Sequence, residues 1–124
     1  MRMLIVDDSD FIRGFLKQHL WRLGAQCDEA GDGEQALAVL RAEGKFDVML
    51  VDVNMPVMDG LECVRRLRIE GLCNDMKVMM VTAEMDSSFI CRALEYGADE
   101  FLMKPFTPQS LREKLLLMGF DMAA

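Results

Sequence analysis

Five polar residues stand at the ends of apolar runs of the chain: Asp7, Asp8, Asp52, Thr82 and Lys104. Carboxylates held close together raise one another's pKa unless a cation compensates them. Oxygen ligands without histidine or cysteine favour a hard divalent ion, here Mg²⁺ with Mn²⁺ as an alternative. Because Mg²⁺ keeps water positions open for an incoming phosphate, these residues predict phosphoryl chemistry.

The remaining groups suit a phosphoryl group. Lys104 supplies a second positive charge, and the Thr82 hydroxyl and the Ala83 backbone N–H can donate hydrogen bonds to phosphoryl oxygens. Asp52 can attack phosphorus itself, because a carboxylate is already an ionised nucleophile. Taken singly, these are ordinary turn, cap and loop residues, so the prediction depends on their convergence.

Convergence requires a fold that brings these positions to one edge. Short continuous apolar runs, with helical periodicity between them, predict strands buried on both faces and alternating with helices. The expected strands cover residues 4–6, 25–29, 48–51, 78–81 and 100–103, and the helical periodicity covers 11–23, 36–40, 61–68, 89–94 and 111–118. Ser9 or Asp10 would cap the first helix, which would end at Gly24, and the last two helices would stop at Gly97 and near Gly119.

This alternation predicts an α/β fold, with a five-stranded parallel sheet and helices on both faces. The flavodoxin-like (βα)5 arrangement has strand order 2-1-3-4-5 and binds ligands at the carboxyl ends of strands one and three. Asp7, Asp8 and Asp52 would meet there.

Length and composition agree with one soluble domain over residues 1–124. A hydrophobic fraction of 52% suffices for a core, and a net charge of −7 argues against a nucleic-acid partner. No apolar window is long enough to span a membrane and the N-terminus is too short for a secretory signal, so we expect a cytoplasmic protein. The cysteines form no C-x-x-C pair and are expected to be free thiols: Cys27, Cys63, Cys73 and Cys91.

A second phosphate motif competes with this interpretation. Residues 31–36 read G-x-G-x-x-A between a strand and a helix, with Asp52 at a distance suited to a ribose contact. However, Asp32 and Glu34 would face the pyrophosphate, and the motif follows the second strand. We favour turn residues before the second helix.

The site residues also carry a resemblance to a known family. Together, Asp7-Asp8, Asp52 with Asn54-Met55-Pro56 and Met58-Asp59-Gly60, Thr82-Ala83 and Lys104-Pro105-Phe106 resemble the response regulator receiver domains of two-component signalling, the CheY-like proteins. The resemblance covers essentially the whole chain. It implies a phosphorelay switch that takes a phosphoryl group from a phosphohistidine on a sensor histidine kinase or a phosphotransfer protein. Such a protein catalyses only its own phosphorylation and dephosphorylation and is otherwise not an enzyme.

The resemblance implies a role for each matching residue. Asp52 would be the phosphoacceptor. The Asp8 and Asp52 carboxylates and the backbone carbonyl of Asn54 would bind Mg²⁺, with Asp7 acting directly or through water. Lys104 would pair with the phosphoryl group, and its bond to the following proline would be cis.

Further positions would carry the switch and its lifetime. Thr82 would swing toward the aspartyl phosphate and the Phe101 ring would turn inward behind it, so that the surface of the fourth helix, fifth strand and fifth helix changes partners. Chemotaxis members of the family carry Tyr where this chain has Phe101, so the resemblance does not settle which surface of this chain carries the output. Asn54 and Glu84 match the chemotaxis-type pair that tunes the approach of water, so we predict relatively fast self-dephosphorylation.

Two alternatives remain open. One is a receiver-fold module that binds proteins without being phosphorylated, and the other is a phosphohydrolase with an aspartyl nucleophile. The second would need a cap or extra strands around its substrate, for which 124 residues leave no room. No effector domain is expected within residues 1–124, so output would pass to an unknown protein target.

Four aromatic or apolar positions stay outside the predicted site. His19 is expected to be structural or on the surface, and Trp21 to be a packing residue. Phe120 and Met122 leave a contact through the tail open.

Overall fold

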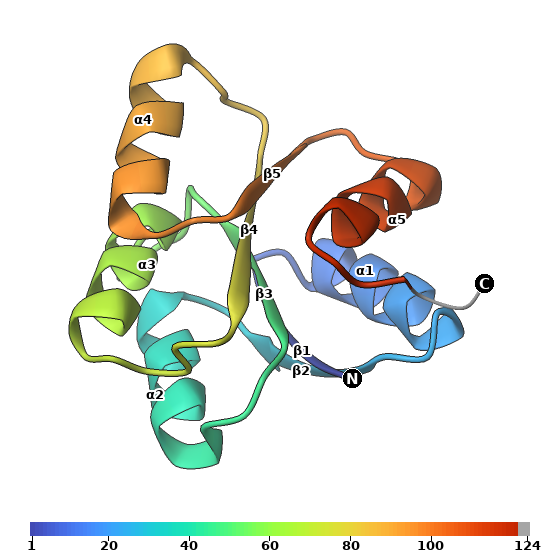
Figure 1. The fold of residues 1–124 in the computed structure, drawn as a ribbon, viewed down its shortest axis with the longest axis horizontal. Helices are drawn as coiled ribbons and strands as arrows, with labels where there is room; N and C mark the ends of the chain where they lie inside the picture. Colours follow the sequence, from blue (N-terminus) through green and yellow to red (C-terminus); the bar gives the residue numbers. More distant parts are fainter. Residues whose placement is uncertain (122–124) are drawn as a thin grey trace.

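The computed structural model describes residues 1–121. Five strands and five helices alternate along this part of the chain (Figure 1), which confirms the predicted pattern. In chain order they are β1 (Arg2–Val6), α1 (Asp10–Arg22), β2 (Gln26–Ala30), α2 (Gly33–Glu43), β3 (Val48–Asp52), α3 (Gly60–Ile69), β4 (Lys77–Thr82), α4 (Ser87–Tyr96), β5 (Glu100–Met103) and α5 (Pro108–Leu117). Met122, considered above for a tail contact, lies outside the described residues.

The strands form one parallel sheet in the predicted order, β2-β1-β3-β4-β5. Val6 of β1 lies beside Ala30 of β2 and Val51 of β3. Asp52, the last residue of β3, lies beside Val81 of β4. The chain leaves β1 toward one edge of the sheet and β3 toward the other, so the carboxyl ends of these two strands form the switch point at which sheets of this kind bind ligands.

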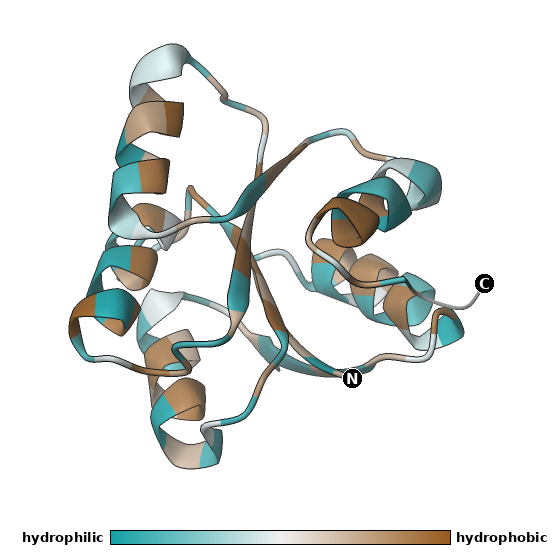
Figure 2. Ribbon diagram, viewed as in Figure 1, coloured by the Kyte–Doolittle hydropathy of each residue, from teal (hydrophilic) through white to brown (hydrophobic). Residues whose placement is uncertain are grey.

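Helices cover both faces of the sheet: α1 and α5 lie on one side, and α2, α3 and α4 on the other (Figure 1). Leu4 and Val6 of β1 belong to the core on the α2–α4 side, whereas Met3 and Ile5 belong to the core under α1 and α5. Hydrophobic and hydrophilic colours alternate along the helices in Figure 2, as expected for helices with one buried face. A strand buried on both faces shows no polar alternation, which is why the central strands form continuous apolar runs.

Three helices, α2, α4 and α5, begin two or three residues before the first apolar residue of the predicted periodicity. Asp32, Asp59 and Asp86 cap α2, α3 and α4, and each carboxylate accepts a hydrogen bond of 2.8–2.9 Å from the backbone N–H three residues on. The residues that α2, α4 and α5 place before that apolar position are glycine, proline or polar, so they add nothing to the periodicity. Since the Asp32 carboxylate occupies the N-terminus of α2, where a pyrophosphate would bind, the structure favours the turn interpretation of residues 31–36.

The expectation that Trp21 is a packing residue is wrong. Trp21 is 73% exposed, whereas Leu16 and Leu20 are the buried residues of α1. A residue directly after Leu20 is turned by about 100° around the helix, which takes its side chain off the buried face. His19 is half-buried with its ring 4.3 Å from that of Phe15, in agreement with a structural role.

The cysteines are free, as predicted. Burial raises the pKa of the Cys27 thiol to about 11 and that of Cys63 to about 12, so neither forms a thiolate readily. Within residues 1–121, no helix is both long enough and apolar enough to cross a bilayer.

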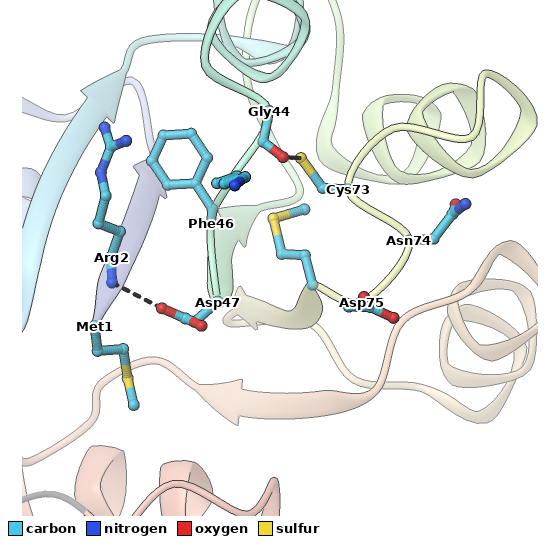
Figure 3. Close-up of a pocket in the computed structure, with 10 residues that line it drawn as sticks. Met1, Arg2, Gly44, Phe46, Asp47, Cys73, Asn74 and Asp75 are labelled. Carbon is cyan, nitrogen blue, oxygen red and sulfur yellow. Dashed lines mark hydrogen bonds between the residues drawn. The ribbon is translucent and has the colours of Figure 1, made fainter.

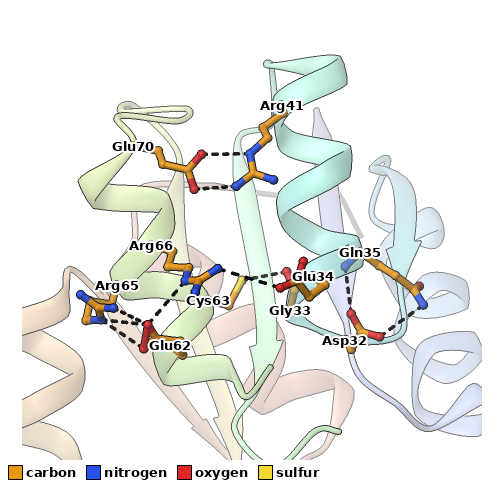
Figure 4. Close-up of polar contacts among 10 residues, drawn as sticks. All are labelled: Asp32, Gly33, Glu34, Gln35, Arg41, Glu62, Cys63, Arg65, Arg66 and Glu70. Carbon is orange, nitrogen blue, oxygen red and sulfur yellow. Dashed lines mark hydrogen bonds and ion pairs between the residues drawn. The ribbon is translucent and has the colours of Figure 1, made fainter. Parts of the chain in front are cut away.

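Polar contacts join α2 to α3 (Figure 4). Arg41 of α2 donates two hydrogen bonds, of 2.9 and 2.7 Å, to the Glu70 carboxylate at the end of α3. Glu34 in the first turn of α2 has Oε1 3.9 Å from Nη1 of Arg66, in the last turn of α3. Exposed pairs of this kind are each worth only about 0–1 kcal/mol, so they orient the two helices more than they stabilise them.

Two glycines allow the loop after β3 to pack closely. A Cβ on Gly33 would lie 2.8 Å from the Met58 side chain, and the Gly33 N–H donates to the Met58 carbonyl at 3.1 Å. A Cβ on Gly60 would lie 2.0 Å from the Asp52 carbonyl oxygen, and the Gly60 N–H donates to the Val53 carbonyl at 2.9 Å. The first turn of α3 therefore lies directly against the end of β3.

We expect Gly60→Ala to lower the free energy of unfolding by about 1–3 kcal/mol, because the new methyl group overlaps the Asp52 carbonyl and the backbone must shift. Gly14→Ala is the matched control: Gly14 lies inside α1, and a Cβ there would have nothing within 4 Å. That change should raise the free energy of unfolding by about 0.5–1 kcal/mol. Urea denaturation measures both, and equal stabilities of Gly60→Ala and the wild type would contradict the close approach.

Candidate metal and phosphoryl site

Three carboxylates meet at the carboxyl edge of the sheet. Asp7 and Asp8 follow β1 directly, and Asp52 ends the neighbouring strand β3. One carboxylate oxygen from each lies within 4.8 Å of the others. Asp7 and Asp52 are buried and Asp8 is exposed, so the cluster opens to solvent on the Asp8 side.

Lys104 brings a cation to this cluster from the loop after β5. Its ammonium nitrogen lies 2.9 Å from Oδ2 of Asp7 and 3.5 Å from Oδ2 of Asp52. Its backbone N–H donates to the Thr82 carbonyl at 2.9 Å, which ties this loop to the end of β4. The Lys104–Pro105 peptide bond is cis, as the resemblance implied.

Burial is the main cause that raises the pKa of the Asp52 carboxyl above its ordinary value. The Lys104 ammonium opposes this effect, the Asp7 carboxylate adds to it, and the Val53 N–H, which donates to Asp52 Oδ1 at 2.8 Å, opposes it. Burial by itself would lower the pKa of Lys104, but Asp7 and Asp52 outweigh burial and raise it. One ammonium group thus compensates two buried carboxylates incompletely.

The donor atoms suit a hard divalent cation. Carboxylate oxygens from Asp7, Asp8 and Asp52, with the backbone carbonyl of Asn54 two residues beyond, make an all-oxygen set. Oxygen ligands of this kind favour Mg²⁺, which fills its remaining positions with water or phosphate. The excess of negative charge described above also favours a cation here.

The remaining predicted residues lie at the end of β4 and in the loops after β3 and β4. Thr82 ends β4, is 1% exposed, and its hydroxyl accepts a hydrogen bond from the Glu84 N–H at 3.1 Å. Ala83 is exposed and lines a mainly apolar hollow of about 460 Å³ together with Lys104. Asn54 and Glu84 are exposed in the loops after β3 and β4, and no hydrogen bond among residues 1–121 joins either side chain to the three carboxylates.

Phe101 of β5 is half-buried beside α4. Its ring meets that of Phe89 edge-on, with centroids 6.0 Å apart. The side chain thus already contacts the helix that forms part of the expected output surface.

Sequence reasoning missed Arg13, which reaches back from α1 to the loop after β1. Its Nη1 donates to the Asp7 carbonyl oxygen at 2.5 Å. The available signal was an arginine in the first turns of the helix that directly follows the aspartate pair. From that position a long side chain can turn back toward the loop.

A more spacious hollow lies elsewhere in the molecule (Figure 3). It has a volume of about 750 Å³ and lies at the amino ends of β1 and β3, away from the carboxylates. Two polar contacts join residues of its lining: the Arg2 N–H donates to Asp47 at 2.9 Å, and the Cys73 thiol contacts the Gly44 carbonyl at 3.3 Å. Size alone therefore does not mark the chemical site.

Comparisons with known proteins agree with the geometry. Residues 3–116 match the model of the response regulator receiver domain. The chemotaxis protein CheY homolog of Campylobacter jejuni is 41% identical over 116 residues, which cover 93% of this chain and 89% of that protein. Chemotaxis protein CheY of Pseudomonas aeruginosa is 40% identical over 93% of each chain.

Solved structures give the same result. Chemotaxis protein CheY4 of Vibrio cholerae has a TM-score of 0.88 at 34% identity, and the match covers 96% of this chain and 98% of that one. CheY in the CheX-CheY-BeF3-Mg²⁺ complex of Borrelia burgdorferi has a TM-score of 0.87 at 27% identity, over 97% and 90% of the two chains. The family model covers nearly the whole chain, and the relatives and the strand order agree with it. The chain therefore belongs to the response regulator receiver domains of the CheY-like proteins.

Proposed function

We propose that this chain is a phosphoacceptor switch in which Asp52 receives a phosphoryl group from a phosphohistidine in a Mg²⁺-dependent reaction. The protein would act in the cytoplasm, and the donor would be a sensor histidine kinase or a histidine phosphotransfer protein. The observation that carries the proposal is the position of the Lys104 ammonium, 2.9 Å from Asp7 and 3.5 Å from Asp52, in a cluster of three carboxylates. This arrangement provides a nucleophile, a cation for the phosphoryl oxygens and a set of metal ligands within one crevice.

In the reaction, an oxygen of the ionised Asp52 carboxylate attacks phosphorus and the P–N bond to the donor imidazole breaks. The electron pair of that bond stays on the imidazole nitrogen, which takes a proton. The Lys104 ammonium, the Thr82 hydroxyl and the Ala83 N–H can stabilise the phosphoryl oxygens. The carboxylates and the Asn54 carbonyl would hold Mg²⁺, which supplies further positive charge to the same oxygens.

The signal would then pass to a protein partner. We propose that Thr82 and Phe101 couple the phosphorylated site to the α4-β5-α5 surface, where Leu94 and Met103 are 52% and 53% exposed. The Borrelia burgdorferi relative is described in a complex with CheX, BeF3 and Mg²⁺, which supports both a Mg²⁺ site and a protein partner for this chain. The proposal treats residues 1–124 as one receiver domain whose only catalysis is of its own phosphorylation and dephosphorylation.

The test of phosphoryl transfer uses phosphoramidate, a small donor that has the P–N bond of phosphohistidine. With Mg²⁺, intact mass should show a gain of one phosphoryl group, because Asp52 is the nucleophile. Asp52→Asn and chelation with EDTA should each abolish the gain. Asp75→Asn, which removes an exposed carboxyl at the other end of the molecule, is the matched control and should retain it.

Three results would count against this function. An adduct that persists in Asp52→Asn would move the acceptor elsewhere. No adduct with phosphoramidate or acetyl phosphate would favour the module that only binds proteins. Continuous turnover of phosphate esters would favour the phosphohydrolase.

A second prediction concerns pH and the metal-free protein. Folding raises the pKa of Asp52, so ionisation of this carboxyl opposes folding. Its contribution to the free energy of unfolding therefore falls as pH rises from about 4, the ordinary aspartate pKa, through the pKa in the folded protein. In EDTA at pH 7, Asp52→Asn should therefore be more stable than the wild type by about 1 kcal/mol, as is common when a functional group is removed.

Urea denaturation at a series of pH values measures this difference. It should shrink as pH falls, because a protonated Asp52 resembles asparagine, and it should shrink on addition of Mg²⁺, which stabilises the wild type by binding. Lys104 keeps its partner Asp7 in the variant. A variant less stable than the wild type at pH 7 in EDTA would contradict the unfavourable burial of the ionised carboxylate.

A third prediction concerns the lifetime of the phosphorylated state. We expect the aspartyl phosphate to decay within minutes in Mg²⁺ after the donor is removed, because the exposed residues Asn54 and Glu84 leave room for the attacking water. Intact mass against time measures the decay, and EDTA added after phosphorylation should slow it. An adduct that lasts many hours in Mg²⁺ would rule out this role for the pair.

A further inference from the structure

We propose that Arg13 of α1 is a positioning residue for the metal-binding segment Asp7–Asp8. The inference rests on the proposed function. Its basis is the hydrogen bond of 2.5 Å from Arg13 Nη1 to the Asp7 carbonyl oxygen. That carbonyl belongs to the peptide unit that joins Asp7 to Asp8, so the contact fixes the plane between two ligand-bearing residues.

The Asp7 carbonyl needs such a donor because the sheet ends at this point. The register between β1 and β2 stops at Val6 and Ala30, and the Asp7 N–H makes the next hydrogen bond, to the Ala30 carbonyl at 3.1 Å. The Asp7 carbonyl lies beyond the last paired residues of the ladder. The Arg13 guanidinium donates to it in place of a neighbouring strand, and a charged donor makes this a strong hydrogen bond.

Arg13 is itself held on two further sides. Its Nε donates to Glu29 of β2 at 3.2 Å, and its Nη2 donates to the Asp10 carboxylate at the start of α1. The side chain is only 16% exposed. Three different nitrogens of one planar group thus connect the edge strand, the helix start and the loop, which a lysine with its single nitrogen cannot reproduce.

The Asp7 carboxylate is fixed separately from its carbonyl. Oδ1 accepts the Ser9 N–H at 2.9 Å and Oδ2 accepts the Lys104 ammonium at 2.9 Å. Asp8, in contrast, is exposed, and its place in the cluster depends on the backbone that carries it. Loss of the Arg13 contact should therefore affect chiefly the orientation of Asp8 relative to Asp7 and Asp52.

A role through charge and a role in positioning predict opposite changes in Mg²⁺ affinity when Arg13 is removed. Removing a positive charge near a cation site lowers repulsion, which strengthens Mg²⁺ binding. Removing a group that orients a ligand weakens metal binding by about 10–100-fold where such contacts have been deleted. The direction of the change therefore distinguishes a positioning role from a role through charge alone.

Lys17 supplies the matched control. It lies one turn further along α1 and its ammonium is 3.2 Å from the same Glu29 carboxylate, but it makes no contact with Asp7. Lys17→Met removes the same charge from the same neighbourhood and leaves the Asp7 carbonyl bonded to Arg13. Its effect on Mg²⁺ binding measures the contribution of charge.

The experiment is calorimetric titration of the full chain with MgCl2, with circular dichroism to check the fold. We expect Arg13→Met to raise the Kd for Mg²⁺ about tenfold or more, the lower end for lost supporting contacts. Lys17→Met should leave the Kd unchanged or slightly lower. Arg13→Lys, which keeps the charge and loses the three-sided contact, should weaken binding in the same direction as Arg13→Met.

Amide hydrogen exchange without metal is the second readout. In both Arg13 variants the Asp8 and Ser9 amides should exchange faster than in the wild type, whereas a helix amide of α5 should not change. If Arg13→Met fails to fold, Arg13→Lys carries the test.

Two results would overturn the inference alone: wild-type Mg²⁺ affinity in Arg13→Lys, or binding in a folded Arg13→Met as tight as in Lys17→Met. A wild-type protein that does not bind Mg²⁺ at all would instead overturn the proposed function together with this inference. The failure of the positioning role and the failure of the function are thus separate outcomes.

Discussion

Burial disfavours an ionised carboxylate unless a cation or hydrogen-bond donors compensate it, and this constraint governs the carboxyl edge of the sheet. Asp7 and Asp52 are 2% and 8% exposed, and the ammonium of Lys104 reaches both. Lys104 is 97 residues away from Asp7 in the chain, and it arrives from the opposite edge strand, β5. The ion pair therefore forms only when β1, β3 and β5 are all in place, so the charge balance of the site depends on the whole fold.

The charge balance is incomplete, because one ammonium faces three carboxylates. Burial raises the pKa of Asp52 despite the nearby Lys104, which shows that the compensation falls short. A fully neutralised cluster would have little attraction for a further cation, whereas this one keeps negative charge on the open Asp8 side. The uncompensated negative charge makes the metal-free site unfavourable and, for the same reason, gives the site its affinity for a divalent ion.

The order of the strands and the meeting of Asp7, Asp8 and Asp52 were predictable from the sequence, because buried parallel strands form continuous apolar runs and the polar residues stand at their ends. The starts of α2, α4 and α5 were not, since their first residues are glycine, proline or polar. Trp21 was misjudged because its apolar character suggested burial, although its place directly after the buried Leu20 turns it off the buried face. Arg13 was missed because its role depends on a contact with a backbone carbonyl, which leaves no trace in hydropathy.

The contacts around the site divide into a fixed side and a side that can respond. Asp7 is held by Ser9, Arg13 and Lys104, and through Arg13 it is tied to α1 and β2, away from the α4-β5-α5 surface. On the other side, the Thr82 hydroxyl accepts from Glu84 in the loop that leads to α4, and the ring of Phe101 rests against Phe89 of α4. Under the proposed function, a phosphoryl group on Asp52 that draws the Thr82 hydroxyl away must break the bond to Glu84. The change is then passed toward α4, because Ser9 and Arg13 continue to hold Asp7 on the opposite side of the site.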